Sequence, residues 1–354
     1  MTMINIYSFP YNIEANPYLE LFYDALRDYA FIQKSGLIVN DNWLIANSSK
    51  IDILHFHWPE DIWRTRGQSK IARLRGVIGF WKYLRLAHKL NINIWWTLHN
   101  IEHHEGVDFV DIMGYRVLSK QSNIIICHSN YAANLFKKRY KTKGKIIIMY
   151  HGLYEGVYPP PEPREKVLKE LNLDPSVPTF SCLGNIRHYK GFDLAAKAIA
   201  NIDTQVQLII AGNVHKDYNI DLLKKIIAQS KNKIVLIPRF LTNQEFSNFI
   251  NASDSIILPY RKITTSGLLL AALTFLKPVI VCNHPYFREI FGEFKEGVKF
   301  FDPNKSHSLI SAILDFISAN NKNKTEKHLK LLRNKYLWKN TIKSLVNEIN
   351  GIEK

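Results

Sequence analysis

The sequence predicts an α/β protein with two domains, each built on a parallel β-sheet. Its 354 residues leave room for two domains of ordinary size, and 46% of them are hydrophobic. Short apolar runs rich in β-branched residues alternate with longer helical patterns, which is typical of strands buried on both faces of a parallel sheet. Near the middle, the proline-rich segment 154–163 can join neither a helix interior nor a central strand. It predicts a stiff connector between the domains.

The expected strands fall into two groups, one on each side of the connector. Five precede it, at 3–7, 51–56, 93–98, 123–127 and 145–149. Six follow it, at 179–183, 206–211, 233–237, 255–258, 279–282 and 298–301. Ligands bind at the carboxyl ends of the strands in open parallel sheets. We therefore expect functional residues directly after these runs.

We expect three segments along the chain. Residues 1–155 form an N-terminal domain, and residues 156–325 form a second domain. Residues 326–354 are lysine-rich and then amphipathic, with apolar residues at mostly helical spacing. We expect this tail to form a terminal helix that packs back towards the N-terminal domain.

The composition and the order of residues exclude several classes of protein. The three cysteines lie in separate apolar stretches without a paired short spacing, which argues against a disulfide framework and against a thiolate metal site. The first residues do not resemble a signal peptide, and no stretch approaches the roughly 18 apolar residues of a membrane-spanning helix. We therefore expect a cytoplasmic protein.

The positive charge is concentrated in one segment. Residues 61–145 hold 16 basic and 5 acidic residues, so +11 of the formal net charge of +16 comes from this part of the chain. Such a field attracts nucleic acid, anionic lipid headgroups or a phosphorylated substrate by the same physics. Charge alone does not choose among these partners.

Within that segment, residues 71–90 predict a basic helix that is also rich in aromatic and aliphatic residues. Its cations are Arg73, Arg75, Lys82, Arg85 and Lys89. The pattern favours a helix that lies on an anionic membrane surface, at the inner face of the cytoplasmic membrane. The alternative is an ordinary sheet-covering helix whose apolar residues face the core.

Two loops of the second domain suit an anion. After the strand at 179–183, a turn that begins at Gly184 and carries Arg187 and Lys190 leads into a helix. After the strand at 255–258, residues 264–267 (Thr-Thr-Ser-Gly) precede an apolar helix. Free backbone N–H groups at a helix start, together with Arg and Lys, bind phosphate. The alternative is a tight turn with solvated cations and a simple N-cap.

Taken in order, these motifs resemble nucleotide-sugar-dependent glycosyltransferases of the GT-B fold, close to family 4 and related bacterial exopolysaccharide glycosyltransferases. The resemblance implies two Rossmann-like domains facing a central cleft. It also implies transfer of a sugar from a nucleotide-diphosphate sugar to a hydroxyl of a glycan or polyprenyl-linked acceptor, in polysaccharide or glycoconjugate biosynthesis, without a metal or cofactor. The motifs that carry it begin at His55 (His-Phe-His-Trp-Pro), Thr97 (Thr-Leu-His-Asn-Ile-Glu-His-His-Glu), Ile148 (Ile-Met-Tyr-His-Gly), Leu183 (Leu-Gly-Asn-Ile-Arg-His-Tyr-Lys-Gly), Ile209 (Ile-Ile-Ala-Gly), Ala252 (Ala-Ser-Asp-Ser-Ile-Ile-Leu-Pro-Tyr) and Thr264.

The resemblance assigns donor-binding roles in the second domain. Arg187 and Lys190 would hold the diphosphate beside Gly184, with Thr265 and the amides of Ser266 and Gly267. Backbone near Arg239 and Phe240 would meet the nucleotide base. The chain departs from the family at Asn185, where an Arg is common, and at Ile263 and Ala271, where family 4 has two glutamates. Retention or inversion of the anomeric configuration therefore stays open.

The catalytic floor is expected in the first domain. In the resembling enzymes, the His that matches His99 faces the donor sugar, and in the inverting groups a nearby carboxylate acts as general base. We rank Glu105 first as this base, with Glu102 and then Asp108 behind it. Asn16, His57, Asn100 and His104 are expected on the acceptor side of the cleft. The cluster of histidines and carboxylates would also suit a metal, but its spacing fits no zinc pattern.

His55 and His57 lie in and after the second expected strand. We expect their imidazoles on opposite faces of it, with His57 towards the site because a loop follows it. A structural role in the core is the alternative for each of them.

Two other functions remain as alternatives. The first is a non-catalytic nucleotide- or glycan-binding subunit of a polysaccharide assembly complex. In this alternative, the absence of the two glutamates reflects a loss of catalytic activity. The second is a nucleic-acid-binding protein that uses the basic segment. Because the sequence contains no recognisable nucleic-acid module, we expect no nucleic-acid partner.

Overall fold

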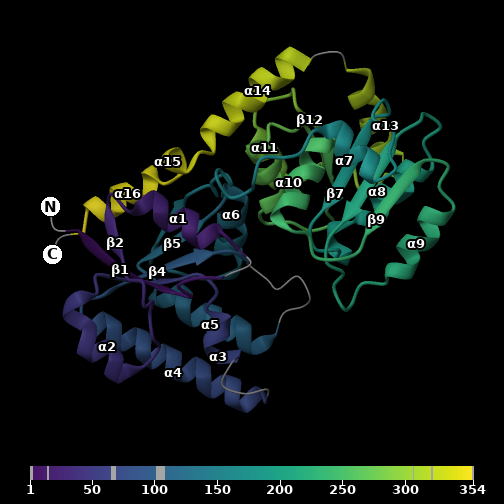
Figure 1. The fold of residues 1–354 in the computed structure, drawn as a ribbon. Coiled ribbons are helices and arrows are strands. Elements are labelled where there is room, and N and C mark those ends of the chain that lie inside the picture. The colour runs from purple at the N-terminus through teal and green to yellow at the C-terminus, as the bar shows by residue number, and fades with distance from the viewer. Residues whose placement is uncertain are drawn as a thin grey trace. The chain divides into compact units, whose positions relative to one another are not determined.

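The computed structural model describes residues 3–13, 16–64, 69–100, 108–305, 307–319 and 322–352. The chain divides into two compact units. Unit 1 comprises Met1–Gly152 and Trp338–Lys354, and unit 2 comprises Leu153–Leu337. Each unit contains a six-stranded parallel sheet with helices on its faces (Figure 1). The predicted fold class is confirmed.

The sheet of unit 1 has the order β2-β1-β3-β4-β5-β6. Its strands are β1 (Ile4–Phe9), β2 (Ala30–Ile32), β3 (Ile53–Phe56), β4 (Asn93–Leu98), β5 (Ile124–Cys127) and β6 (Lys145–Ile148). The helices are α1 (Tyr18–Leu26), α2 (Asp41–Asn47), α3 (Glu60–Arg64), α4 (Lys70–Lys89), α5 (Phe109–Gln121), α6 (Asn130–Arg139), α15 (Trp338–Thr341) and α16 (Lys343–Asn350), with a 3-10 turn at Ser48–Lys50. Two apolar clusters fill the two faces of the sheet. One joins it to α2, α3, α4, α5 and α6, and the other joins it to α1 and α16.

The sheet of unit 2 has the order β12-β11-β10-β7-β8-β9. Its strands are β7 (Thr179–Leu183), β8 (Gln207–Ala211), β9 (Lys233–Ile237), β10 (Ser255–Leu258), β11 (Val279–Cys282) and β12 (Val298–Phe301). The helices are α7 (Arg164–Glu170), α8 (Phe192–Ala200), α9 (Ile220–Ala228), α10 (Asn243–Ala252), α11 (Gly267–Thr274), α12 (Pro285–Phe291), α13 (Ser308–Ser318) and α14 (Lys322–Lys335), with a 3-10 turn at His188–Lys190. The strand order reverses between β7 and β10. In such sheets the reversal point is where ligands bind, beyond the carboxyl ends of the strands.

The boundaries of the units differ from the expected ones. The first boundary lies between Gly152 and Leu153, three residues before the expected position. The expected tail 326–354 is split, because α14 belongs to unit 2 and only Trp338 onwards belongs to unit 1. Leu329 and Leu332 of α14 are buried, and the Tyr336 hydroxyl donates a hydrogen bond to the carbonyl of Ile290 (2.9 Å). These contacts hold the first part of the tail in unit 2.

Across the described ranges, no helix combines the length and the hydropathy that a membrane span requires.

Candidate active site

The structure brings the two predicted anion loops together. β7 and β10 are neighbours in the sheet, so the loops that follow them start side by side. Arg261 ties the loops to each other: its guanidinium donates to both oxygens of Asp193 (2.9 and 2.7 Å) and to the carbonyl of His188 (2.8 Å). Gly191 has φ +67°, and a Cβ there would stand 2.0 Å from the carbonyl oxygen of Pro259. Only glycine allows this approach of the two loops.

Lys190 lies where these loops meet. Its Nζ stands 5.5 Å from the centre of the Tyr260 ring, and a Cβ built on Gly184 would lie 3.4 Å from the same nitrogen. Within the part of the chain that the structure describes, Lys190 forms no ion pair with a carboxylate. Burial, and then the charge of Arg187, lower the pKa of Lys190 to about 8. The site thus holds two cations close together, and an anion would stabilise both charges.

Ser266 already has hydrogen-bond partners inside unit 2. Its amide donates to the hydroxyl of Tyr286 (3.2 Å), and its hydroxyl caps α11 by accepting from the amide of Leu269 (3.2 Å). Its side chain is only 3% exposed. The hydroxyl therefore serves as the N-cap of α11, and the amide already has a partner, so contact of this amide with a diphosphate stays a prediction. Thr265 and Gly267, on either side of it, are each partly exposed.

The other predicted donor-site positions of unit 2 lie after β9 and around the start of α11. Arg239 follows β9, and its guanidinium pairs with Glu245 (2.5 and 3.0 Å). Phe240, beside it, is 70% exposed, so its ring is available to a ligand. Ile263 and Ala271, where family 4 has glutamates, are both buried apolar positions. They provide no carboxylate at the start of α11.

Histidines gather at the carboxyl ends of the strands of unit 1. His57, His99, His128 and His151 follow β3, β4, β5 and β6, and all four rings contact Tyr18 of α1 at centroid distances between 4.8 and 5.8 Å. The ring of His99 also stacks on Trp58, at 4.0 Å and 10°. With His55 of β3, these four residues are called the histidine cluster below. Among the described residues, no group of three His, Cys, Asp or Glu side chains is placed to hold a metal ion.

His55 and His57 point to the same side, so the expectation of opposite faces is wrong. Side chains two residues apart along a strand lie on one face. Both rings bond to the hydroxyl of Tyr23 of α1, through His55 Nδ1 (2.9 Å) and His57 Nε2 (2.9 Å). His57 Nδ1 in turn lies 3.1 Å from His99 Nε2, and His55 Nε2 lies 2.8 Å from Thr97 Oγ1.

This hydrogen-bonded chain couples the tautomers of three histidines. A neutral imidazole donates from one ring nitrogen and accepts at the other, and the Tyr23 hydroxyl donates only once. At least one of His55 and His57 therefore donates to the Tyr23 oxygen. The tautomer of His99, at the end of the chain, is coupled to that of His57, because one of the two facing ring nitrogens donates and the other accepts.

The histidine cluster is uncharged. Burial lowers the pKa of His55 and of His151 to about 3 and that of His128 to about 4. Burial, and then the neighbouring imidazoles, hold the pKa of His57 and of His99 well below the usual value. At neutral pH His99 therefore offers a hydrogen bond and no charge.

The predicted catalytic carboxylates are only partly described. Glu102, His104 and Glu105 lie outside the described residues. Asp108 accepts from the amide of Val110 (2.8 Å) and pairs with Arg73, and these contacts lower its pKa. A carboxylate of lowered pKa that caps a helix and pairs with arginine does not suit a general base, so Asp108 drops from the list of candidates.

Glu60 is a further carboxylate beside the histidine cluster and is not among the predicted bases. Glu60, the first residue of α3, is 6% exposed. With His57, His99 and Asn100 it lines a small cavity of about 10 Å³. The available sequence signal was its position, as the first carboxylate after β3. Asn16, by contrast, accepts from the amide of Tyr18 (3.1 Å) at the start of α1.

Comparison with known proteins identifies the class of enzyme. Residues 163–335, about half of the chain, match the model of the family described as Glycosyl transferases group 1. The "GDP-mannose:glycolipid 4-beta-D-mannosyltransferase" of Xanthomonas campestris pv. campestris is 25% identical over 310 residues, which are 87% of this chain and 82% of that protein.

Solved structures show the same fold. Anabaena HepE in complex with UDP has a TM-score of 0.71 and 13% identity, over 99% of this chain and 100% of its own. A glycosyltransferase from Rickettsia africae has a TM-score of 0.68 and 16% identity, over 100% of both chains. The chain is therefore a glycosyltransferase of the GT-B fold. Its second unit carries the glycosyl transferases group 1 domain, and the predicted resemblance is confirmed.

Proposed function

We propose that this glycosyltransferase transfers mannose from GDP-mannose to a hydroxyl of a lipid-linked glycan, with inversion at the anomeric carbon, at the inner face of the cytoplasmic membrane. The donor and the acceptor class come from the name of the Xanthomonas relative. The observation that carries the proposal is the position of Lys190, a cation without a carboxylate partner in the described chain, at the meeting of two strand-to-helix loops.

The same site supports transfer without a metal. In the transferase reaction the bond between the sugar and the diphosphate breaks, and negative charge grows on the departing nucleoside diphosphate. Preorganised positive groups stabilise that charge more in the transition state than in the ground state. Lys190 and Arg187 would stabilise the charge of the departing diphosphate, which in other enzymes is the function of a divalent cation. We therefore propose that a chelator leaves the activity unchanged.

Inversion is supported by two observations. GDP-mannose carries its sugar in the α configuration, and the name of the relative specifies a β product. Buried Ile263 and Ala271 leave the start of α11 without the paired glutamates of family 4. An inverting reaction needs a base for the acceptor proton. Glu105 and Glu102 remain the predicted bases, and Glu60 is added because it lines a cavity with His99.

The test is a transfer assay with a polyprenyl-diphosphate-linked glycan as acceptor and a panel of donors that includes GDP-mannose and UDP-glucose. We expect transfer from GDP-mannose alone, with the same rate in EDTA, and a β-linked product by NMR. Nucleotide binding without transfer from any donor would instead support the binding-subunit alternative. An α-linked product would contradict inversion.

The exposed face of α4 supports contact with an anionic membrane. Ile71, Ile78 and Trp81 are 67%, 47% and 37% exposed, which is unusual for large apolar groups on one helix. Arg75, Lys82, Arg85 and Lys89 are exposed on the same helix, and the guanidinium of Arg85 lies over the Trp81 ring (5.2 Å). Apolar and basic groups together are what an interfacial helix presents to anionic lipid.

Arg73, which is among the expected cations of this helix, does not belong to the exposed surface. Its guanidinium pairs with Asp108 and with Asp111 (3.0 Å), and its side chain is 16% exposed. Arg64 pairs with the same Asp111 (2.5 Å). Arg73 therefore joins α4 to α5 inside unit 1.

Neutralising two of the exposed cations is expected to weaken membrane binding. Each cation near an anionic surface contributes about 1 kcal/mol, so Arg75→Gln with Arg85→Gln should raise the dissociation constant roughly thirtyfold. Sedimentation with vesicles of phosphatidylcholine and phosphatidylglycerol measures this dissociation constant. The control pair Lys137→Gln with Lys138→Gln removes the same charge from exposed positions of α6 and should have little effect. An equal loss for both pairs would show that net charge, and not the face of α4, attracts the membrane.

A further inference from the structure

Unit 2 contains a cavity at the end of its sheet that is opposite to the donor loops. The cavity measures about 380 Å³, within the range of roughly 300–1,000 Å³ that is usual for sites of small molecules. Val177, Asp254, Pro278 and Gly297 contribute to its lining, from the segments directly before β7, β10, β11 and β12. The end of α13 and the start of α14 complete it. The loops that hold Lys190 and Ser266 leave the carboxyl ends of β7 and β10 instead.

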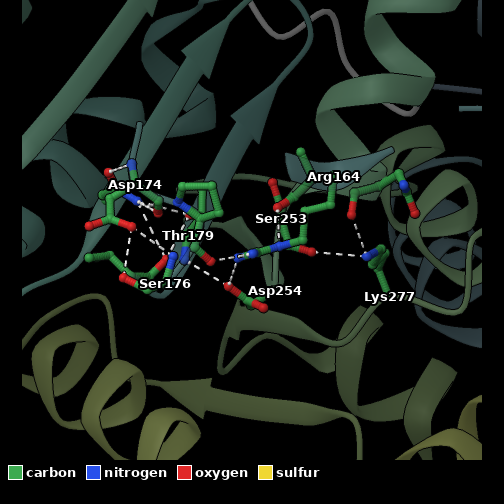
Figure 2. A network of polar contacts seen from close by, with 12 residues as sticks. Arg164, Asp174, Ser176, Thr179, Ser253, Asp254 and Lys277 are labelled. Atoms are coloured by element: carbon green, nitrogen blue, oxygen red, sulfur yellow. Dashed lines mark hydrogen bonds and ion pairs between the residues drawn. The ribbon is translucent and has the colours of Figure 1, made fainter. Parts of the chain in front are cut away.

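Arg164 and Asp254 of the lining belong to a polar network that continues behind the cavity wall (Figure 2). Arg164 donates to Asp254 (2.9 Å), and the same carboxylate accepts from the amide of Thr179 (2.8 Å). Lys277 donates to the carbonyl of Ser253 (3.0 Å) on the other side of the network. Because these groups bond to one another, the wall keeps its shape without a ligand.

The other walls are largely apolar. Val177 and Val298 are buried, and Pro278, Phe316 and Ile317 are half-buried with surface turned to the cavity. The ring of Phe316 packs edge-on against Phe180 in the core (5.7 Å). An apolar body that entered the cavity would cover these groups from water.

The charges of the lining are unbalanced. Its two carboxylates already have partners: Asp254 pairs with Arg164, and Glu296 pairs with Lys324 (3.0 Å). The lining also holds Lys295, Lys299 and Lys322. Among the described residues, these three lysines form no ion pair. The unmet charge of the cavity is therefore positive.

We propose that this cavity binds an amphiphilic anion, with a hydrocarbon body against the apolar walls and a phosphate group at Lys295, Lys299 and Lys322. The site is separate from the donor site and does not depend on the identity of the donor. Because the cavity and the donor loops lie at opposite ends of the same strands, an occupant would not compete with a nucleotide. The phosphate could belong to a membrane lipid or to a soluble amphiphile, and the two sources share this chemistry.

Isothermal titration calorimetry with octyl phosphate tests the proposal on the full chain. We expect one molecule to bind per chain, at least tenfold more tightly than octanol or inorganic phosphate, since each of these offers only one half of the chemistry. Lys299→Glu reverses a charge of the lining and should weaken binding at least tenfold. Ala319→Trp, at an exposed position of the lining, should fill the cavity and weaken it by as much. Lys225→Glu, at an exposed position of α9, is the control and should bind as the unaltered chain does.

Several results would overturn the proposal. The proposal is wrong if octyl phosphate does not bind, or if octanol binds as tightly as octyl phosphate does. It is also wrong if Lys299→Glu and Ala319→Trp both bind octyl phosphate as tightly as the unaltered chain does. Circular dichroism establishes that each variant is folded before titration. Vesicles that contain phosphatidate then distinguish the sources of the phosphate. If Ala319→Trp lowers binding to them tenfold, the ligand is a membrane lipid, and if only the soluble octyl phosphate is affected, it is a soluble amphiphile.

Discussion

Lowering the pH from 7 to 5 is expected to destabilise unit 1 by at least about 6 kcal/mol, which is comparable to the whole stability of an ordinary domain. The cause is the histidine cluster. In the unfolded chain each histidine binds a proton near pH 6.5, whereas in the folded unit the pKa of His55 and of His151 is about 3 and that of His128 is about 4. Below pH 6.5 the unfolded state therefore holds more protons, and stability is lost as the pH falls. Each of the three contributes about 1.4 kcal/mol per pH unit, until the pH approaches its value in the folded unit.

Tryptophan fluorescence measures this loss for unit 1 alone. The chain has seven tryptophans, at positions 43, 58, 63, 81, 95, 96 and 338, and all of them belong to unit 1. Urea unfolding followed by this signal should give a free energy of unfolding that falls by at least about 4 kcal/mol per pH unit below pH 6, since His57 and His99 add to the three histidines counted above. A reporter that is confined to one unit matters because chains of two domains rarely unfold in one step.

A variant isolates the contribution of one histidine. His128→Asn keeps an N–H near the position of Nδ1, which contacts the carbonyl oxygen of Met149 (2.9 Å), and cannot take up a proton. The variant is expected to be less stable at pH 7 because its side chain is smaller. Its dependence on pH should nevertheless be shallower by about 1.4 kcal/mol per pH unit. A free energy of unfolding that stays constant between pH 7 and 5 would contradict the buried, neutral state of the cluster.

The strands could be predicted because burial on both faces leaves a continuous apolar run. All eleven expected strands are present within a few residues of their predicted ends. Only β2 was missed, since its three residues form an edge strand with Phe31 exposed and carry no such pattern. The terminal tail was harder to place. Its helical spacing predicts an apolar face, but which unit covers that face depends on contacts with Gly297 and Ile290, far away in the sequence.

The candidate site could be predicted where position after a strand was enough. Lys190, His57 and His99 could be predicted in this way. His57 and His99 directly follow β3 and β4, and Lys190 lies in the loop after β7. Position after a strand is not enough where the role of a residue depends on a partner that is distant in the sequence. Ser266 looks the same in sequence whether its amide is free or bonded, and the hydroxyl that occupies it comes from Tyr286. Glu60 is a candidate base only because the fold brings the start of α3 beside His99, which cannot be seen in the sequence.

Replacing Lys190 is expected to lower kcat by two to three orders of magnitude and to leave the ligand-free protein as stable as before. A positioned group that stabilises the charge of the transition state is worth roughly 10²–10³ in rate. Removing it should not weaken the fold, since a partly buried ammonium without a carboxylate partner in the described chain costs free energy. Lys190→Met retains most of the volume of the side chain. Lys197→Ala, at an exposed position of α8 in the same unit, is the matched control and should keep full activity. Steady-state transfer and thermal unfolding of the three proteins measure both effects.

The affinity for GDP-mannose should also report the pKa of Lys190, which is about 8. The diphosphate binds the protonated ammonium, so affinity is constant below pH 8 and falls as the pH rises through it. Between pH 7 and 9 the protonated fraction, and with it the affinity, should drop about tenfold. GDP-mannose keeps the charge of its diphosphate over this range, and Lys190→Arg holds its own proton throughout. The arginine variant should therefore show no such fall at Lys190, even if its geometry makes binding weaker at every pH. If both proteins lost affinity equally between pH 7 and 9, a group other than Lys190 would be titrating, and the assignment of Lys190 to the diphosphate would be wrong.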